Sequence, residues 1–173
     1  MIFNKLLMMG AIVVQLASSP SAEPVVKELY TPTQIEINNI AKEVCEDYDN
    51  VDPELVIAII QRESEYIPDV ENGGCVGLMQ VSKKYHTGRA EELGVDDFLD
   101  PTGNIMIGVD YLSELIEEYD DVYLALMLYN MKWKSAFEMY NSGKISNYAR
   151  TVVEQKNALC ELSAEELYGG GDQ

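Results

Sequence analysis

The chain has 173 residues, of which 47% are hydrophobic and 24% are charged, and thirty acidic residues against twelve basic ones give it a net charge of -18. This composition excludes a fully disordered or collagen-like chain, and the length is enough for one domain with its own core. The acidic balance argues against nucleic acid as a partner, because binding phosphates needs a basic surface. Lys83, Lys84 and Arg89 form the one basic cluster that we expect.

The first 22 residues have the layout of a secretory signal peptide. Lys5 is their single charge, an apolar stretch covers residues 6–16, and small residues fill positions 17–22. A retained amphipathic anchor is the alternative. We expect residues 1–22 to be removed and the protein to be secreted or to act in the cell envelope, with no stable membrane span afterwards, since no apolar run approaches about 20 residues.

Two helices are predicted in the first third of the remaining chain. A Thr-Pro pair at residues 31–32 and an Asp-Pro pair at residues 52–53 are typical of helix starts. The first helix has an apolar face at helical spacing and should end near residue 49. The second has a line of side chains at i, i+4 and i+8, which are Leu55, Ile59 and Glu63.

The rest of the chain is predicted to be a loop followed by three more helices. Glycines and a proline favour a loop over residues 65–77. Asp-Pro at residues 100–101 opens a third helix, the Ala, Leu and Met content of residues 122–129 favours a buried helix, and a last helix should begin near residue 146. We therefore expect a mainly α, single globular domain over residues 30–160 with at least five helices and irregular loops, then a C-terminal tail over residues 161–173.

Three cysteines and one histidine limit the chemistry. Cys45, Cys75 and Cys160 could form at most one disulfide, and the three possible pairings cannot be ranked. No Cys/His spacing suggests a metal site, so we expect no metal and no cofactor. His86 lies among polar residues and is expected on the surface.

Glu63 is the strongest candidate for a catalytic group. It ends an apolar helical line beside a Gly-rich loop, and burial there would raise the pKa of its carboxyl group. A carboxylic acid that stays protonated near neutral pH can protonate a leaving-group oxygen, as in the cleavage of glycosidic bonds. The alternative is an ordinary surface Glu paired with Arg62 or Lys83.

Two further segments could line a ligand site. Gly77 would let the backbone approach a ligand, Met79 would give an adaptable apolar wall, and Gln80 would give an amide, although a turn followed by core residues would look the same. Tyr129 and Asn130 end the apolar run, and Tyr148 lies in the last helix. A Tyr ring with a polar tip suits a sugar face or can orient a carboxyl group, but a buried Tyr whose hydroxyl reaches water fits equally well.

The order of these segments resembles the SLT-type lytic transglycosylase domain, which has a lysozyme-like fold related to goose-type lysozyme. The likeness runs from about residue 35 to residue 155. It is carried by residues 52–55, 61–64, 77–80, 93–101, 104–108, 111–112 and 129–130.

The resemblance implies roles for particular residues. Glu63 would be the single catalytic acid and base, with Ser64 beside the substrate. The glycan-binding positions would be Gly77, Met79, Gln80, Tyr129 and Asn130, and Tyr148 would hydrogen-bond the catalytic carboxyl. One departure stands out. The family usually follows Tyr-Asn with a small residue and Gly, whereas this chain has Met131, Lys132 and Trp133. Trp133 would be either a replacement sugar platform or a core residue.

The resemblance also implies a reaction and a substrate. The family cleaves the β-1,4 bond between N-acetylmuramic acid and N-acetylglucosamine in peptidoglycan and leaves 1,6-anhydromuramoyl ends, without a cofactor. We expect a monomer that acts in this way on glycan strands. The alternatives are a hydrolytic goose-type lysozyme, with Asp69 or Glu71 as a second carboxylate, and a scaffold in a cell-wall-spanning machine that binds glycan without cutting it.

Overall fold

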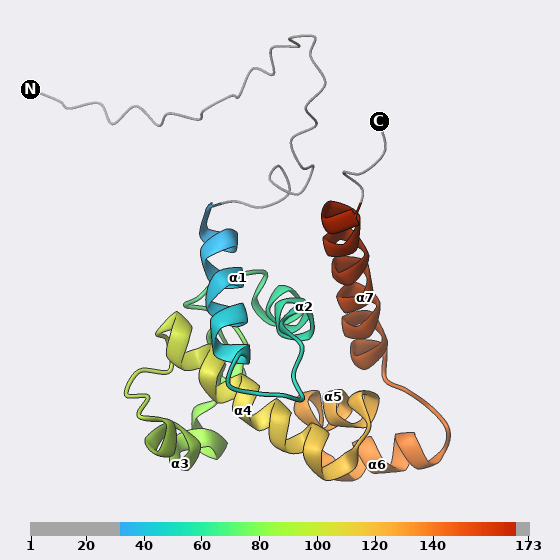
Figure 1. Ribbon diagram of the computed structural model, residues 1–173. Helices are drawn as coiled ribbons and strands as arrows, with labels where there is room; N and C mark the ends of the chain where they lie inside the picture. The colour runs from blue at the N-terminus through green and yellow to red at the C-terminus, as the bar shows by residue number, and fades with distance from the viewer. Residues whose placement is uncertain (1–31, 169–173) are drawn as a thin grey trace, which may run out of the picture.

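The computed structural model describes residues 32–168, which form seven helices and a small sheet (Figure 1). The predicted signal peptide and the last five residues lie outside the described residues. The elements are α1 Pro32–Cys45, α2 Pro53–Ser64, β1 Glu71–Asn72, β2 Cys75–Val76, β3 Val81–Ser82, α3 Lys83–Leu93, α4 Pro101–Tyr119, α5 Val122–Asn130, α6 Trp133–Asn141 and α7 Asn147–Tyr168. None of the helices within residues 32–168 is long and apolar enough to cross a bilayer.

The five predicted helices are all present and begin at or within a residue of the expected positions. Helices α2 and α4 each have Pro at the first position, after an extended Asp. The Asp100 side chain accepts a hydrogen bond from the backbone N–H of Gly103 at 2.8 Å. Asp121 caps α5 in the same way through the N–H of Leu124 at 2.9 Å. These caps satisfy backbone donors that a helix start leaves unpaired.

Two helices and the sheet were not predicted, and two helix ends lie elsewhere. Helix α3 buries only Ala90 among its described side chains and lacks the apolar stripe that marks a helix in sequence. Helix α6 has a stripe, with Trp133, Ala136, Phe137 and Tyr140 at i, i+3, i+4 and i+7, but it is only nine residues long. The three antiparallel strands, in the order β1-β2-β3, have two residues each and show no alternation. Helix α1 ends at Cys45 rather than near residue 49, and α7 runs to Tyr168, into the range that we expected to be a tail.

Helix α2 lies at the centre of the molecule. Six consecutive residues of it, from Leu55 to Ile60, are buried, so the helix is covered on all sides. It packs mainly against α7 and also against α1, while α4 packs against α1 and α5. Figure 1 shows α1 and α7 on either side of α2, with α4 and α5 across the lower part of the molecule. This packing fixes the end of α2, where Glu63 lies.

Candidate active site

Glu63 lies in the last turn of α2, where the chain turns sharply away. Glu65 and Tyr66, the two residues that follow the helix, both adopt left-handed backbone conformations with φ of 51° and 64°. Glu63 is half-buried, and this burial raises the pKa of its carboxyl group. Interactions with Tyr148 and with Arg62 oppose the rise without cancelling it. The side chain thus favours its protonated form more than a solvated Glu does.

Groups from three other elements surround the Glu63 carboxyl. Burial raises the pKa of Cys75 in β2, of Tyr129 in α5 and of Tyr148 in α7, and in each case the nearby Glu63 charge adds to the rise. The Tyr148 hydroxyl is buried and forms no hydrogen bond of standard geometry in the structure, yet it interacts directly with Glu63. Both tyrosines therefore keep their protons, and the Tyr148 hydroxyl can donate to the Glu63 carboxylate.

The turn that contains Gly77 is held by one buried side chain, Asn104. Its Oδ1 accepts from the N–H of Met79 at 2.8 Å, and its Nδ2 donates to the carbonyls of Val76 at 2.9 Å and Phe98 at 2.8 Å. Gly77 has φ of +77°, and a Cβ added there would lie 2.2 Å from Asn104 Nδ2. A side chain at this position would displace the amide that holds the turn.

The second support of this turn is the packing of Met79 against α4. Met79 is fully buried, and a Cβ on Gly108 would lie 2.5 Å from its sulfur. The Met79 carbonyl accepts a hydrogen bond from the Tyr129 hydroxyl at 2.9 Å. The turn is thereby linked to the aromatic ring that lies beside Glu63.

The other predicted site residues, Ser64, Gln80 and Asn130, differ in their burial and in their hydrogen-bond partners. Ser64 is buried and donates to the carbonyl of Ile60 at 3.0 Å, within its own helix. The Gln80 amide donates to the carbonyls of Val70 and Gly77 at 3.1 and 3.0 Å. Asn130 is exposed. The structure thus brings Glu63, Tyr129 and Tyr148 together, whereas the Ser64 and Met79 side chains support the site from within.

Asn104 is a residue of the site region that its sequence pattern did not single out. It lay within a matched motif, but nothing in its neighbourhood indicated that it bonds three backbone groups. Two of those groups lie 25 and 28 residues away along the chain. The signal that was available is an Asn on the inner face of an apolar helix, since a buried amide needs several partners.

Two expectations about residues beside the turn are wrong, namely that His86 lies on the surface and that Arg89 belongs to a basic cluster. His86 is half-buried, with its ring 4.6 Å from that of Tyr111, and Tyr111 in turn lies 5.6 Å from Tyr129. Arg89 forms ion pairs with Asp110 and with Glu114. His86 is therefore part of an aromatic row rather than a surface residue, and the predicted basic cluster loses Arg89 to these acidic partners.

Lys83 does not pair with Glu63, which was one alternative for that carboxylate. Its ammonium group lies 3.9 Å from Glu71 in β1. Asp69 is exposed, as is Glu71. Cys45, Cys75 and Cys160 are all free thiols in the structure. Glu63 is thus a carboxyl group in a partly apolar setting, while the two acidic residues of the following loop are solvated.

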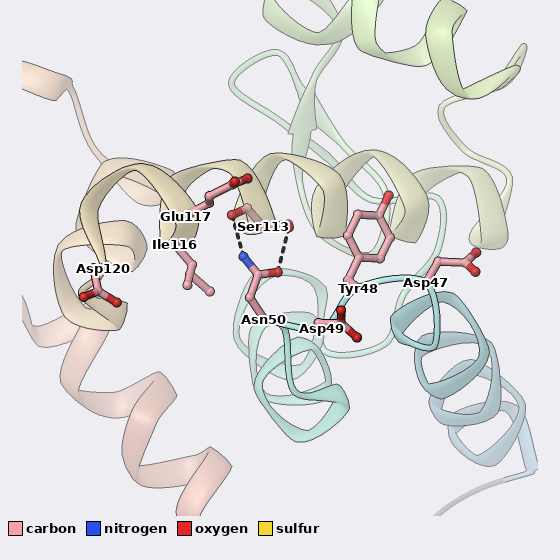
Figure 2. Close-up of a pocket in the computed structure, with 8 residues that line it drawn as sticks. All are labelled: Asp47, Tyr48, Asp49, Asn50, Ser113, Ile116, Glu117 and Asp120. Carbon is pink, nitrogen blue, oxygen red and sulfur yellow. Dashed lines mark hydrogen bonds between the residues drawn. The ribbon is translucent and has the colours of Figure 1, made fainter.

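An acidic groove of about 720 Å³ lies elsewhere, between the α1–α2 loop and α4, and Figure 2 shows its lining. Asn50 and Ser113 join its two sides, with Asn50 Nδ2 donating to the Ser113 carbonyl at 3.0 Å and Ser113 Oγ donating to Asn50 Oδ1 at 2.7 Å. Within the described residues, no group of three or more His, Cys, Asp or Glu side chains is arranged to hold a metal ion. We assign the groove no role.

Comparisons with known proteins agree with the fold. The chain is 40% identical over 112 residues to the transglycosylase of Enterobacteria phage PRD1, a match that covers 64% of this chain and 39% of the phage protein. It is 33% identical over 130 residues to membrane-bound lytic murein transglycosylase F of Serratia proteamaculans, covering 68% of this chain and 25% of the relative. The chain thus spans well under half the length of these relatives.

A solved structure gives the fold itself. The 70-kDa soluble lytic transglycosylase of Escherichia coli superposes with a TM-score of 0.55 at 21% identity, over 77% of this chain and 24% of that one. This confirms the predicted mainly α, lysozyme-like fold. The family model for the transglycosylase SLT domain matches residues 41–149. The chain therefore belongs to the transglycosylase SLT domain family.

Proposed function

We propose that the protein is a peptidoglycan lytic transglycosylase, which cleaves the β-1,4 bond between N-acetylmuramic acid and N-acetylglucosamine. The observation that carries this proposal is the half-buried Glu63 carboxyl, whose pKa is raised by burial and which faces Tyr129 and Tyr148. A carboxyl group that keeps its proton more readily than a solvated Glu is suited to protonate a leaving glycosidic oxygen.

Glu63 would act first as an acid and then as a base. It would give its proton to the glycosidic oxygen as the bond to C1 of the muramoyl residue breaks. The resulting carboxylate would take the proton of the muramoyl C6 hydroxyl, whose oxygen then bonds to C1 and closes the 1,6-anhydro ring. Because the nucleophile belongs to the substrate, its attack is intramolecular and needs no second enzyme carboxylate to direct water.

The tyrosines would tune Glu63 through both steps. A hydroxyl near the carboxyl stabilises the carboxylate, so Tyr148 limits the rise in the Glu63 pKa and would support the base form after the first proton transfer. Tyr129 would be held in place by its bond to the Met79 carbonyl. We assign Gln80 and Asn130 to the surrounding glycan-binding surface, and Gly77, Met79 and Ser64 to its support.

Exposure of the other acidic residues favours transglycosylation over hydrolysis. An inverting hydrolase needs a second carboxylate across the bond. Asp69 and Glu71 are the nearest acidic residues in sequence after Glu65. Both are exposed, and Glu71 pairs with Lys83.

We further propose that the protein acts outside the cytoplasm on glycan strands, in keeping with the leader-like residues 1–22.

Mass spectrometry of digested peptidoglycan tests the reaction. Purified sacculi incubated with the protein should release fragments that end in 1,6-anhydromuramic acid. These fragments are about 18 Da lighter than the hydrolysed ones, because one water is not added. A dominance of reducing ends would assign the chain to the hydrolases, and intact sacculi with retained binding would indicate a scaffold.

A further inference from the structure

Trp133 is the first residue of α6 and lies four residues after Tyr129, which neighbours Glu63. An extended chain spans at most about 3.6 Å per residue, so the two Cα atoms lie within about 14 Å of each other. Trp133 is 65% exposed, which excludes the core role that was one of its two predicted alternatives. A single exposed apolar side chain is common on protein surfaces, so the case for a role rests on how the Trp133 ring is held and on what lies near it.

Two aromatic neighbours hold the Trp133 ring. Phe137, one turn later on α6, lies 4.7 Å from it between ring centroids, and Phe137 packs edge-on against Tyr119 at 5.6 Å. The Tyr119 hydroxyl also interacts with Trp133. The ring is therefore oriented by its neighbours while most of its surface faces solvent, so little conformational freedom would be lost on binding.

Helix α4 connects this aromatic group to the Glu63 site. Tyr119 ends α4, and Tyr111 lies eight residues earlier on the same helix, about 12 Å along its axis. Tyr111 is near enough to Tyr119 to interact with it electrostatically, and it packs on Tyr129 at 5.6 Å. Helix α4 thus carries one aromatic contact pair at each end of this stretch, Tyr111 with Tyr129 near Glu63 and Tyr119 with Phe137 near Trp133.

We propose that Trp133 is a platform for a sugar of the glycan strand, outside the residues that flank the cleaved bond. A pyranose ring has an apolar C–H face, and an indole offers a matching flat surface with a polar N–H at its edge. Lys132 and Lys134 flank Trp133 in the sequence, and Lys134 lies 3.8 Å from Glu138, so Lys132 supplies the positive charge that could attract a carboxylate of peptidoglycan there. This inference rests on the proposed function, because it extends the same substrate site.

Binding of glycan fragments of increasing length tests the platform. All proteins would carry Glu63→Gln to prevent cleavage, and the ligands would be soluble peptidoglycan fragments of two, four and six sugars. Trp133→Ala should weaken binding of the six-sugar fragment about tenfold and leave the two-sugar fragment unchanged. Trp133→Phe should restore part of the affinity, because it keeps a smaller aromatic face.

Tyr85 provides the matched control. It is 75% exposed on α3, and a lysine, Lys84, lies over its ring at 5.0 Å. Tyr85→Ala should leave affinity for every fragment unchanged. If Trp133→Ala binds the six-sugar fragment as tightly as the protein that keeps Trp133, the inference is overturned. A dimer that depends on Trp133, with glycan binding unaffected, would overturn it as well. If the protein with an intact Glu63 neither binds nor cuts sacculi, the proposed function fails instead.

Discussion

The residue that holds the turn beside the candidate site is Asn104. Its amide makes three hydrogen bonds to backbone groups of two loops while being completely buried. It thereby connects the Gly77 turn, the loop before α4 and α4 itself. Glu63 was predictable from its place on an apolar line, whereas the role of Asn104 depends on partners that only the folded chain brings together.

Replacing Asn104 should destabilise the protein strongly. Asn104→Ala leaves one buried N–H, one buried carbonyl and one part-buried carbonyl without their partner, and each buried unsatisfied group costs about 1–3 kcal/mol. We expect the free energy of unfolding in urea to fall by about 3 kcal/mol or more. Asn50→Ala is the control, since Asn50 also makes two hydrogen bonds but is exposed (Figure 2), and it should cost under about 1 kcal/mol. Similar losses in the two variants would contradict this role of Asn104.

The raised pKa of Glu63 links stability to pH. Folding favours its protonated form, so the stability that the proton contributes is fully present below the unfolded pKa of about 4.5 and is lost as the pH rises through the higher folded pKa. Gln does not ionise. Glu63→Gln should therefore raise the melting temperature at pH 7 and have a smaller effect at pH 4. If Glu63→Gln instead lowers the melting temperature, and lowers it more at pH 7 than at pH 4, the pKa of Glu63 is not raised by folding.

At the scale of helices and strands, prediction succeeded where a start signal and an apolar stripe coincide. Helices α2 and α4 have both, in Asp-Pro pairs followed by buried residues at helical spacing. Helix α3 has no apolar stripe, because most of its described side chains face solvent, and its stability comes from packing that the sequence pattern does not display. Helix α6 has a short apolar stripe, but it begins after Lys132, whose side chain does not cap it. The two-residue strands are set by the Gly73-Gly74 turn and by contacts, not by β periodicity.

The contact of α4 with the Gly77 turn can be tested with two glycines in helices. Ala is favoured over Gly in a helix by about 1 kcal/mol. At Gly108 the added Cβ would meet Met79 at 2.5 Å, so Gly108→Ala should lower the free energy of unfolding by about 1–3 kcal/mol. At Gly88 in α3 nothing lies within 4 Å, so Gly88→Ala should be stabilising by about 0.5–1 kcal/mol. If both substitutions raise the free energy of unfolding, the Met79 side chain can move away from an added methyl group at little cost.

For the whole molecule, the acidic charge bears on how the protein meets its substrate. The expected basic cluster is smaller than predicted, because Arg89 is paired with Asp110 and Glu114 and Lys83 is paired with Glu71. Few unpaired basic side chains therefore remain around Lys83, Lys84 and Arg89 to counter the net charge of -18. Under the proposed function, long-range attraction to an anionic wall would not be available, and binding would have to come from contacts in the proposed site and at Trp133.

Salt should accordingly speed association with sacculi. Raising the ionic strength from about 0.01 M to about 0.15 M shortens the screening length from about 30 Å to about 8 Å, and this weakens the repulsion between the acidic protein and anionic polymers. The initial rate at which Glu63→Gln protein binds to purified sacculi should increase over this range. A rate that falls with salt would mean that basic residues, not the net charge, govern the encounter.

The central claim is that the Glu63 carboxyl carries the cleavage. The rate of release of anhydromuropeptides from sacculi, measured for the parent protein, Glu63→Gln and Glu65→Gln, tests it most directly. Glu65 is the control because it lies two residues away at the same helix end but is exposed. Loss of a general acid and base costs about 10²–10⁴-fold, so Glu63→Gln should be at least about a hundredfold slower, with Glu65→Gln close to the parent. Release by the Glu63→Gln protein at the parent rate would contradict the account.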